Sequence, residues 1–163
     1  MIDERMSKEF LALGRLAVVG ASPDDRQFGN VVYRELREHG VDVVPVHPSA
    51  TTVAGDPAFP GVESVDGPLD GVIVMVPADK ALEVVRACAR RGVRHVWLFK
   101  GLGSAGAVSD EVLRECARHD IEVVAGACPL MFLEPVGLVH RIHRAARRVN
   151  HSLVRTPAGT ASR

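Results

Sequence analysis

The chain has 163 residues, of which 47% are hydrophobic and 25% charged, with a formal net charge of zero. This length and composition are typical of one globular domain with a sizeable core and argue against a disordered chain. No apolar run reaches the roughly 20 residues of a membrane span, and the charged N-terminus lacks the apolar core of a signal peptide, so we expect a cytoplasmic protein without membrane contact.

In chain order, the hydrophobic pattern first predicts a short helix over residues 3–13, where apolar residues recur on one helical face. The apolar run 16–19 predicts a strand buried on both faces. A helix over 27–39 and a second strand over 41–46 follow it. Residues 51–68 have no helical period and are rich in Gly and Pro. There we expect a short edge strand near Thr52 to Ala54, a loop and one helical turn.

The second half of the chain repeats this alternation. The run 71–76 predicts another buried strand, and Asp79 is placed to cap a helix that runs to Arg90. The remaining strands are predicted at 95–99 and 121–124, with a helix from Ser109 to His119 between them. Residues 135–150 then predict an amphipathic helix with arginines off its apolar stripe, and residues 151–163 predict a frayed tail.

Strands that alternate with helices are typical of an α/β fold. We predict a doubly wound, mainly parallel sheet of five to six strands with helices on both faces, in a single domain. The domain proper is expected at 15–134, preceded by the helix within 1–14 and followed by the helix at 135–150 and the tail at 151–163.

The stretch around Gly20 organises the sheet. The first strand breaks at Gly20, and the small residues Ala21 and Ser22 follow. Small residues let a ligand phosphate approach backbone N–H groups at the start of a helix. A tight turn between strand and helix also needs glycine when nothing binds, so this stretch alone leaves both interpretations open.

The carboxyl ends of parallel strands lie at one edge of the sheet, where such folds bind ligands. Five separate segments end there in the predicted fold, and we expect them to form one crevice. They are Gly20-Ala21-Ser22, His47-Pro48, Pro77-Ala78, Lys100-Gly101 and Ala127-Cys128-Pro129.

The crevice lacks the usual dinucleotide motifs. Gly20 and Gly29 are too far apart for Gly-x-Gly-x-x-Gly, and no carboxylate follows the second strand to bind ribose hydroxyls. A Walker-type phosphate loop is also absent. Three cations, Arg26, Lys80 and Lys100, nevertheless stand near strand ends, which favours a phosphate-rich ligand.

Taken together, these segments resemble the CoA-binding protein family. The resemblance rests on Val18-Val19-Gly20-Ala21-Ser22-Pro23, Val44-Pro45-Val46-His47-Pro48, Val53-Ala54-Gly55, Val74-Met75-Val76-Pro77 and Ala127-Cys128-Pro129. The family consists of small Rossmann-like domains similar to the CoA-binding domain of the succinyl-CoA synthetase alpha subunit. The resemblance covers about residues 15–135.

The resemblance implies that CoA or an acyl-CoA lies across the carboxyl edge of the sheet. Phosphates would lie near Gly20, Ala21, Ser22, Arg26 and the Phe28-Gly29-Asn30 helix start. His47, where many relatives have asparagine, and Pro48 would border the nucleotide end. Val76 and Pro77 would flank the pantetheine arm, with Lys80 nearby and Lys100 and Gly101 farther along.

The sequence shows no catalytic arrangement and no metal-ligand cluster. The three cysteines do not form a disulfide framework. Cys88 and Cys116 fit the apolar stripes of predicted helices and are expected in the core. Cys128 follows a strand at the ligand edge, and we keep open both a structural role and a mixed disulfide with CoA.

Three functional interpretations follow. The leading one is a CoA or acyl-CoA binding protein without catalytic machinery. The second is a degenerate NAD(P)-dependent oxidoreductase, with Arg26 meeting an NADP phosphate. The third is an interaction subunit with a vestigial nucleotide crevice. In it, the basic C-terminal helix contacts a protein partner or a second copy of the chain. The part of the chain after Glu134 has six arginines and no acid, yet we do not expect a nucleic-acid partner.

Overall fold

The computed structural model describes residues 3–101 and 106–133. Its centre is a five-stranded parallel sheet in the order β2-β1-β5-β6-β7. The strands are β1 (Arg15–Val19), β2 (Asp42–Val46), β5 (Gly71–Val74), β6 (His95–Leu98) and β7 (Glu122–Ala125). The predicted α/β fold is confirmed. The helix expected at 135–150 and the tail at 151–163 lie outside the described residues.

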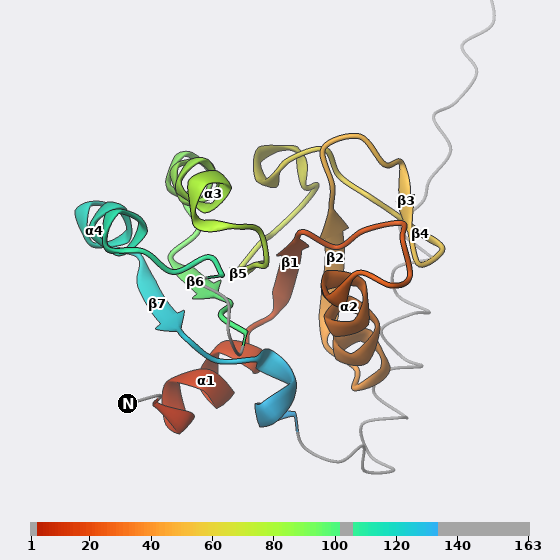
Figure 1. Ribbon diagram of the computed structural model, residues 1–163, viewed down its shortest axis with the longest axis horizontal. Helices are drawn as coiled ribbons and strands as arrows, with labels where there is room; N and C mark the ends of the chain where they lie inside the picture. Colours follow the sequence, from red (N-terminus) through yellow and green to blue (C-terminus); the bar gives the residue numbers. More distant parts are fainter. Residues whose placement is uncertain (1–2, 102–105, 134–163) are drawn as a thin grey trace, which may run out of the picture.

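Helices cover both faces of this sheet (Figure 1). The helices α1 (Glu4–Leu11) and α2 (Phe28–Glu38) lie on one face, and α3 (Ala78–Arg91) and α4 (Asp110–Arg118) on the other. Side chains alternate along each strand. Leu16 and Val18 therefore belong to the core on the α2 side, while Ala17 and Val19 pack on the α3 side.

Trp97 packs the segment after β7 against the face of the sheet that α1 and α2 cover. Its fully buried indole lies 5.4 Å from the Phe10 ring and 5.8 Å from the Phe132 ring, centroid to centroid. Its Nε1–H donates to the carbonyl of Ala127 at 2.9 Å. After β7, the chain therefore turns under the sheet into the 3₁₀ turn η2 (Pro129–Phe132).

The predicted edge strand near Thr52 does not join the main sheet. Thr52–Val53 (β3) pairs antiparallel with Asp56–Pro57 (β4) in a separate hairpin. Ala54 and Gly55 form its turn with φ of 50° and 82°, and two positive φ angles are what a tight hairpin turn requires. The expected helical turn is present as η1 (Val62–Ser64).

Two of the cap and core predictions are confirmed and one is wrong. The Ser109 side chain accepts from the N–H of Val112 and caps α4, and Cys88 and Cys116 are buried. Asp79 does not cap α3, because the helix already begins at Ala78. Asp79 lies inside the first turn, where its charge still suits the positive end of the helix dipole. Within the described part of the chain, no helix is long and apolar enough to cross a membrane.

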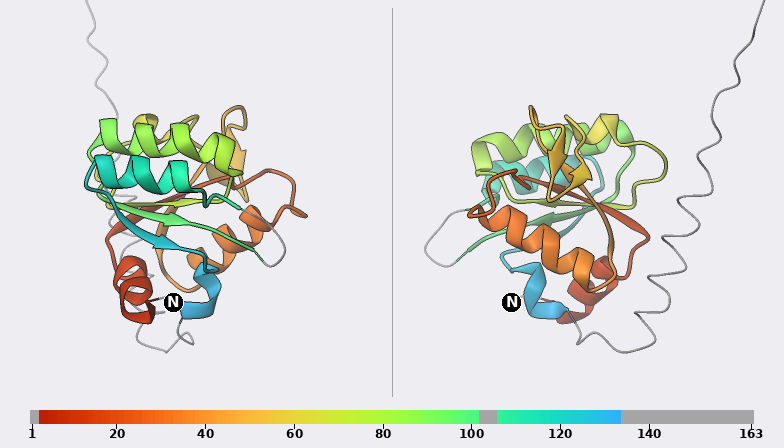
Figure 2. Two further views of the ribbon diagram at one scale, coloured as in Figure 1. Left: turned by 60° about the vertical axis from the view of Figure 1, so that its left-hand side comes forward. Right: turned by 90° about the vertical axis from the view of Figure 1, so that its right-hand side faces the viewer.

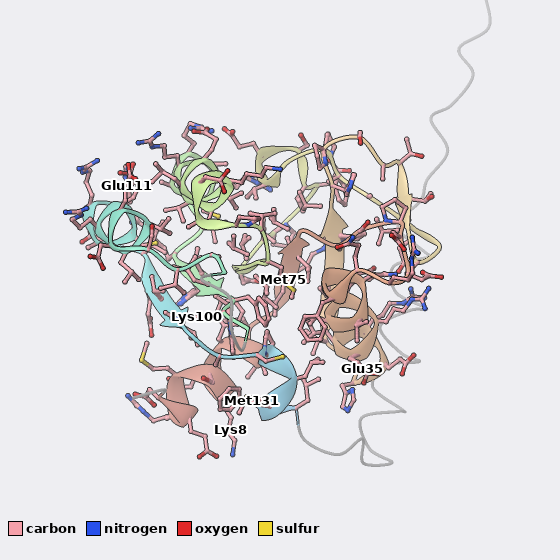
Figure 3. All side chains as sticks on the ribbon, in the orientation of Figure 1. Lys8, Glu35, Met75, Lys100, Glu111 and Met131 are labelled. Carbon is pink, nitrogen blue, oxygen red and sulfur yellow. The ribbon has the colours of Figure 1, made fainter. Side chains whose placement is uncertain are left out.

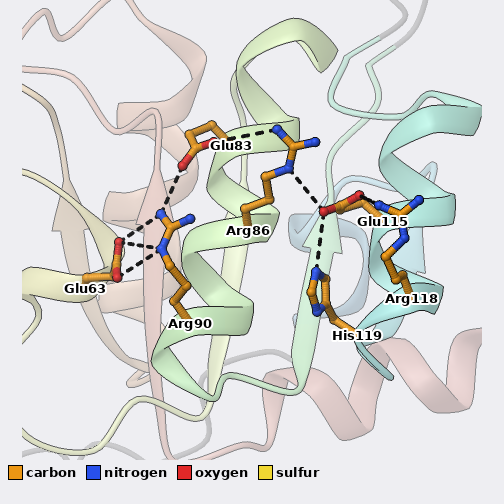
Figure 4. A network of polar contacts seen from close by, with 7 residues as sticks. All are labelled: Glu63, Glu83, Arg86, Arg90, Glu115, Arg118 and His119. Atoms are coloured by element: carbon orange, nitrogen blue, oxygen red, sulfur yellow. Dashed lines mark hydrogen bonds and ion pairs between the residues drawn. The ribbon is translucent and has the colours of Figure 1, made fainter.

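A network of ion pairs covers the outside of α3 and α4 (Figure 4). Glu115 on α4 binds Arg86 on α3 at 3.1 Å and Arg118 at 2.7 Å. Arg90, also on α3, binds Glu63 of η1 at 3.0 Å and so joins these two elements. The network ties three elements together at a distance from the strands' carboxyl ends.

Candidate functional site

The site begins at the point where the chain changes direction within the sheet. From β1 the chain passes through α2 to β2 on one side, and from β5 it passes through α3 to β6 on the other. The carboxyl ends of β1 and β5 are neighbours at this switch point, which is where open α/β sheets bind ligands. The loop after β1 and the start of α2 project at this edge together with the end of β6 (Figure 2).

Two glycines bring α2 against the end of β1. A Cβ on Gly29 would lie 2.1 Å from the carbonyl oxygen of Gly20. Gly20 has φ of +101°, and a Cβ there would lie 3.1 Å from the backbone of Met75. Both positions therefore require glycine, and the start of α2 packs directly on the backbone at the end of β1.

The first turn of α2 has no side-chain cap. Gln27 at its N-cap makes no side-chain hydrogen bond, and the turn carries no acidic residue. The first N–H groups of a helix have no partners within the helix, and their partial positive charge attracts anions. The buried Ala21 and the half-buried Ser22 lead into this turn.

The loop between Gly20 and α2 is folded on its own polar groups. The Ser22 hydroxyl accepts from the N–H of Asp24 at 3.1 Å. Arg26, whose side chain is 91% exposed, donates to Asp24 from Nε at 3.1 Å and from a terminal nitrogen at 3.3 Å. The Arg26 hydrogen bond lowers the pKa of Asp24 below its ordinary value. In this structure Arg26 is therefore paired with an acid of its own loop.

Asn30 lies beneath this loop with one polar atom unpaired. Its Nδ2 donates to Asp25 at 2.9 Å, and Asp25 also accepts from Arg34 at 2.6 Å. The residue is fully buried, and among the described residues its Oδ1 has no hydrogen-bond partner. A buried acceptor of this kind is unusual in folded proteins.

His47 holds the end of β2. Its backbone N–H donates to Phe59 at 2.9 Å. Its ring Nδ1 accepts from the N–H groups of Ser49 at 3.3 Å and Ala50 at 2.9 Å. The neutral ring therefore carries its proton on Nε2, where it can donate. Pro48 beside it is exposed.

The other sequence-predicted residues lie farther along the same edge. Val76 is half-buried, Pro77 is exposed at the uncapped start of α3, and Lys80 is exposed one turn on. Lys100 is exposed after β6, followed by Gly101. Figure 3 shows Met75 beside the end of β1 and Lys100 on the β6 side. Neither lysine has an ion-pair partner among residues 3–101 and 106–133.

Cys128 is displaced from the switch point. It stands at the start of η2, where the chain has turned toward α1 and α2, and is half-buried. Its carbonyl accepts from Met131 at 3.1 Å. Four of the five predicted segments follow strand ends at one edge of the sheet. The fifth, Ala127-Cys128-Pro129, lies under the sheet on the α1–α2 face instead. No potential metal cluster of three or more His, Cys, Asp or Glu is present in the described part.

Sequence reasoning missed two features of this site. It did not foresee that Asp24 and Asp25 engage Arg26 and Arg34, although the adjacent acids in the loop were a signal. It also missed the contact between Phe28 and Phe99, whose ring centroids lie 5.5 Å apart. No local pattern links residues so distant in the chain.

Comparison with known proteins adds three findings. The family model described as "CoA binding domain" matches residues 14–134. Acetate–CoA ligase (ADP-forming) I of Archaeoglobus fulgidus is 31% identical over 118 residues, and the match covers 69% of this chain and 17% of the ligase. The alpha subunit of acetate–CoA ligase (ADP-forming) II of Pyrococcus furiosus is 29% identical over 119 residues, with 69% and 26% covered.

A solved structure shares the fold over most of its length. A hypothetical protein from Pyrococcus horikoshii OT3 superposes with a TM-score of 0.73 at 26% identity, covering 80% of this chain and 89% of that one. In contrast, the chain spans only 17% and 26% of the length of the two ligase sequences.

Proposed function

The chain belongs to the CoA-binding domain family, and from that membership we propose that it binds CoA or an acyl-CoA across the carboxyl edge of its sheet. The observation that carries the proposal is the contact between Gly20 and Gly29. It holds the uncapped start of α2 against the end of β1, where the diphosphate of the coenzyme would lie. The proposal is limited to binding, because the matched ligases are several times longer than the matched region.

The diphosphate would lie against the first turn of α2 and the backbone of Ala21 and Ser22. A helix N-terminus binds phosphate through its free N–H groups and its dipole. Arg26 would reach a phosphate by exchanging its Asp24 partner for the ligand. Because both groups of the Arg26–Asp24 pair are exposed to solvent, that exchange costs little.

The two ends of the coenzyme would extend to opposite sides of the switch point. On the β2 side, the Nε2–H of His47 and the ring of Pro48 would border the nucleotide. On the β5 and β6 side, Val76 and Pro77 would flank the pantetheine arm. Lys80, Lys100 and Gly101 would lie beyond them. The unpaired Oδ1 of Asn30 would accept from a ligand hydroxyl or a water molecule.

The NAD(P) alternative is not favoured. The β2 strand ends in Val46-His47-Pro48, without the acid that binds ribose hydroxyls in NAD-dependent proteins. The matched family is also described by CoA rather than by a nicotinamide cofactor. The interaction-subunit alternative depends on residues 135–150, outside the described part.

Thermal unfolding with a panel of ligands tests the proposal. A ligand that binds only the folded chain raises the melting temperature by mass action. We expect CoA and acetyl-CoA to raise it, and NAD, NADP and ATP to leave it nearly unchanged. Stabilisation by NADP without CoA would favour the oxidoreductase instead. A well-folded chain that responds to none of the five would refute CoA binding.

A further inference from the structure

An exposed aromatic pair stands at the ligand edge of the sheet. Phe28 opens α2 and is 47% exposed, while Phe99 directly follows β6 and is half-buried. Their rings are tilted by 40° with centroids 5.5 Å apart. Val31, one turn along α2, is 39% exposed and continues the same side of the helix. We call Phe28, Val31 and Phe99 the aromatic edge.

Backbone hydrogen bonds hold Phe99 at the end of β6. Its N–H donates to Val74 at 3.0 Å and its carbonyl accepts from Ala107 at 2.8 Å. A Cβ on Gly106 would lie 2.3 Å from that carbonyl, and one on Gly101 would lie 3.3 Å from the Phe99 ring. These contacts hold the Phe99 backbone at the end of β6, and its ring lies against that of Phe28.

The Phe99 end of the aromatic edge lies on the β6 side, toward which the pantetheine arm would run from the first turn of α2. This step rests on the proposed function, with the diphosphate at Gly20 and the nucleotide toward β2. β6 is two strands from β1 in the direction opposite to β2. Neighbouring strands are about 4.8 Å apart, so the distance across the edge is roughly 10 Å. An extended pantetheine arm is longer than this.

The chemistry of the surface indicates what it receives. Phe28, Val31 and Phe99 are uncharged and make no use of a ligand carboxylate. An apolar group that packs against half-exposed aromatic rings removes their remaining surface from water, and this burial favours binding. We propose that the aromatic edge binds the acyl chain of an acyl-CoA, so that the protein binds apolar acyl groups more tightly than free CoA.

Calorimetric titration of the full chain with CoA, hexanoyl-CoA and succinyl-CoA tests this proposal. We expect hexanoyl-CoA to bind about fivefold to tenfold more tightly than CoA, and succinyl-CoA to bind less tightly than hexanoyl-CoA. The variant Phe99→Ala should lose the preference for hexanoyl-CoA while its Kd for CoA stays within about twofold. Phe99→Leu, which keeps an apolar side chain, should retain part of it.

Leu113→Ala is the matched control. Leu113 is also a large exposed apolar side chain, 36% exposed, but it lies on α4 on the other face of the sheet. This variant should keep the full preference. Equal affinities for CoA and hexanoyl-CoA, or a preference that survives Phe99→Ala, would overturn the inference alone. Failure of all three ligands to bind the folded chain would overturn the proposed function together with it.

Discussion

Two regions of the molecule, the Glu115 network and the switch point, differ in how their polar groups are paired. On the α3–α4 side, Glu115 is nearly buried and meets Arg86, Arg118 and His119 (Figure 4). At the switch point on the α2 side, the helix start has no cap and Asn30 keeps an unpaired oxygen. The charged groups of the Glu115 network are paired with one another. The switch point keeps polar groups that have no partner among the described residues, and these are available to a ligand.

This difference separates stability from binding. Changes in the Glu115 network should alter unfolding and leave ligand affinity unchanged, because the network lies away from the carboxyl ends of the strands. Changes at the switch point should weaken ligand binding by more than any loss of folding stability accounts for. The following variants test that separation, from the largest expected effect to the smallest.

Gly29→Ala should have the largest effect. Its new Cβ would meet the Gly20 carbonyl oxygen at 2.1 Å, so α2 must move away from the end of β1. Overpacking of this kind typically costs about 1–3 kcal/mol of stability. The displaced helix start should also weaken CoA binding by tenfold or more, measured by calorimetry.

Gly61→Ala is the control for this substitution. Gly61 has φ of −162°, which any residue adopts, and its new Cβ would meet nothing within 4 Å. Its melting temperature and CoA affinity should both match those of the unmodified chain. If Gly29→Ala behaves like this control in both measurements, the contact between α2 and β1 has no role in binding.

Glu115→Gln should affect stability alone. Loss of the charge leaves Arg86 and Arg118 without their shared partner, and we expect the melting temperature to fall by about 2–4 °C. The Kd for CoA should not change. A Glu115→Gln chain that is folded but binds CoA several times more weakly would break the separation between the two regions.

The same variant carries a pH prediction. The hydrogen bond from Arg86 holds the pKa of Glu115 below its ordinary value of 4.5, and nearby Arg118 acts in the same direction. A carboxylate whose pKa is lower in the folded state than in the unfolded state stabilises the fold at pH values above its unfolded-state pKa. This contribution is lost as the pH falls through its folded-state pKa. The stability difference between the unmodified chain and Glu115→Gln, measured by denaturant titration, should therefore be constant near neutral pH and shrink below about pH 4.5.

Arg26→Ala should weaken CoA binding by severalfold, because Arg26 is exposed and already paired with Asp24. Comparison of CoA with dephospho-CoA locates its contact. An unequal loss places Arg26 on the ribose phosphate, and an equal loss places it on the diphosphate. Arg5→Ala, which removes the same charge from the exposed face of α1, should leave both affinities unchanged. An Arg26→Ala chain with unchanged affinity for both ligands would remove Arg26 from the site.

Cys128 should give the smallest effect, a partial covalent modification. With oxidised CoA, the Cys128 thiolate would attack one sulfur of the CoA disulfide, forming a mixed disulfide and releasing one CoA thiolate. Burial raises the pKa of Cys88 to about 12 and that of Cys116 to about 11, so these thiols should stay unmodified. Mass spectrometry should find one CoA adduct that disappears in Cys128→Ser. An adduct that survives this substitution would exclude Cys128 as the reacting residue.

The parts of the fold that depend on local patterns could be predicted from the sequence. Continuous apolar runs such as 71–76 identified buried strands, and Ser109 identified the start of α4. The hairpin at Thr52–Pro57 could not be predicted in this way. Its pairing partner is a two-residue strand, and two residues are too few to show a period.

The site was only partly predictable for a related reason. Gly20 and Gly29 do not have the spacing of a dinucleotide motif, yet the loop between them returns α2 to the end of β1 and brings the two glycines into contact. The Phe28–Phe99 contact likewise depends on how the fold places the start of α2 near the residue that follows β6. Contacts between distant segments follow from the fold as a whole and leave no mark in either segment alone.

A crystal structure of the chain with CoA tests the central claim most directly. The account predicts the diphosphate within hydrogen-bond distance of backbone N–H groups among residues 20–22 and 28–30, with the thiol end on the β6 side. A coenzyme bound elsewhere, for example along α3 and α4, would contradict it. So would a diphosphate held by side chains alone, with the backbone around Gly20 and Gly29 out of contact.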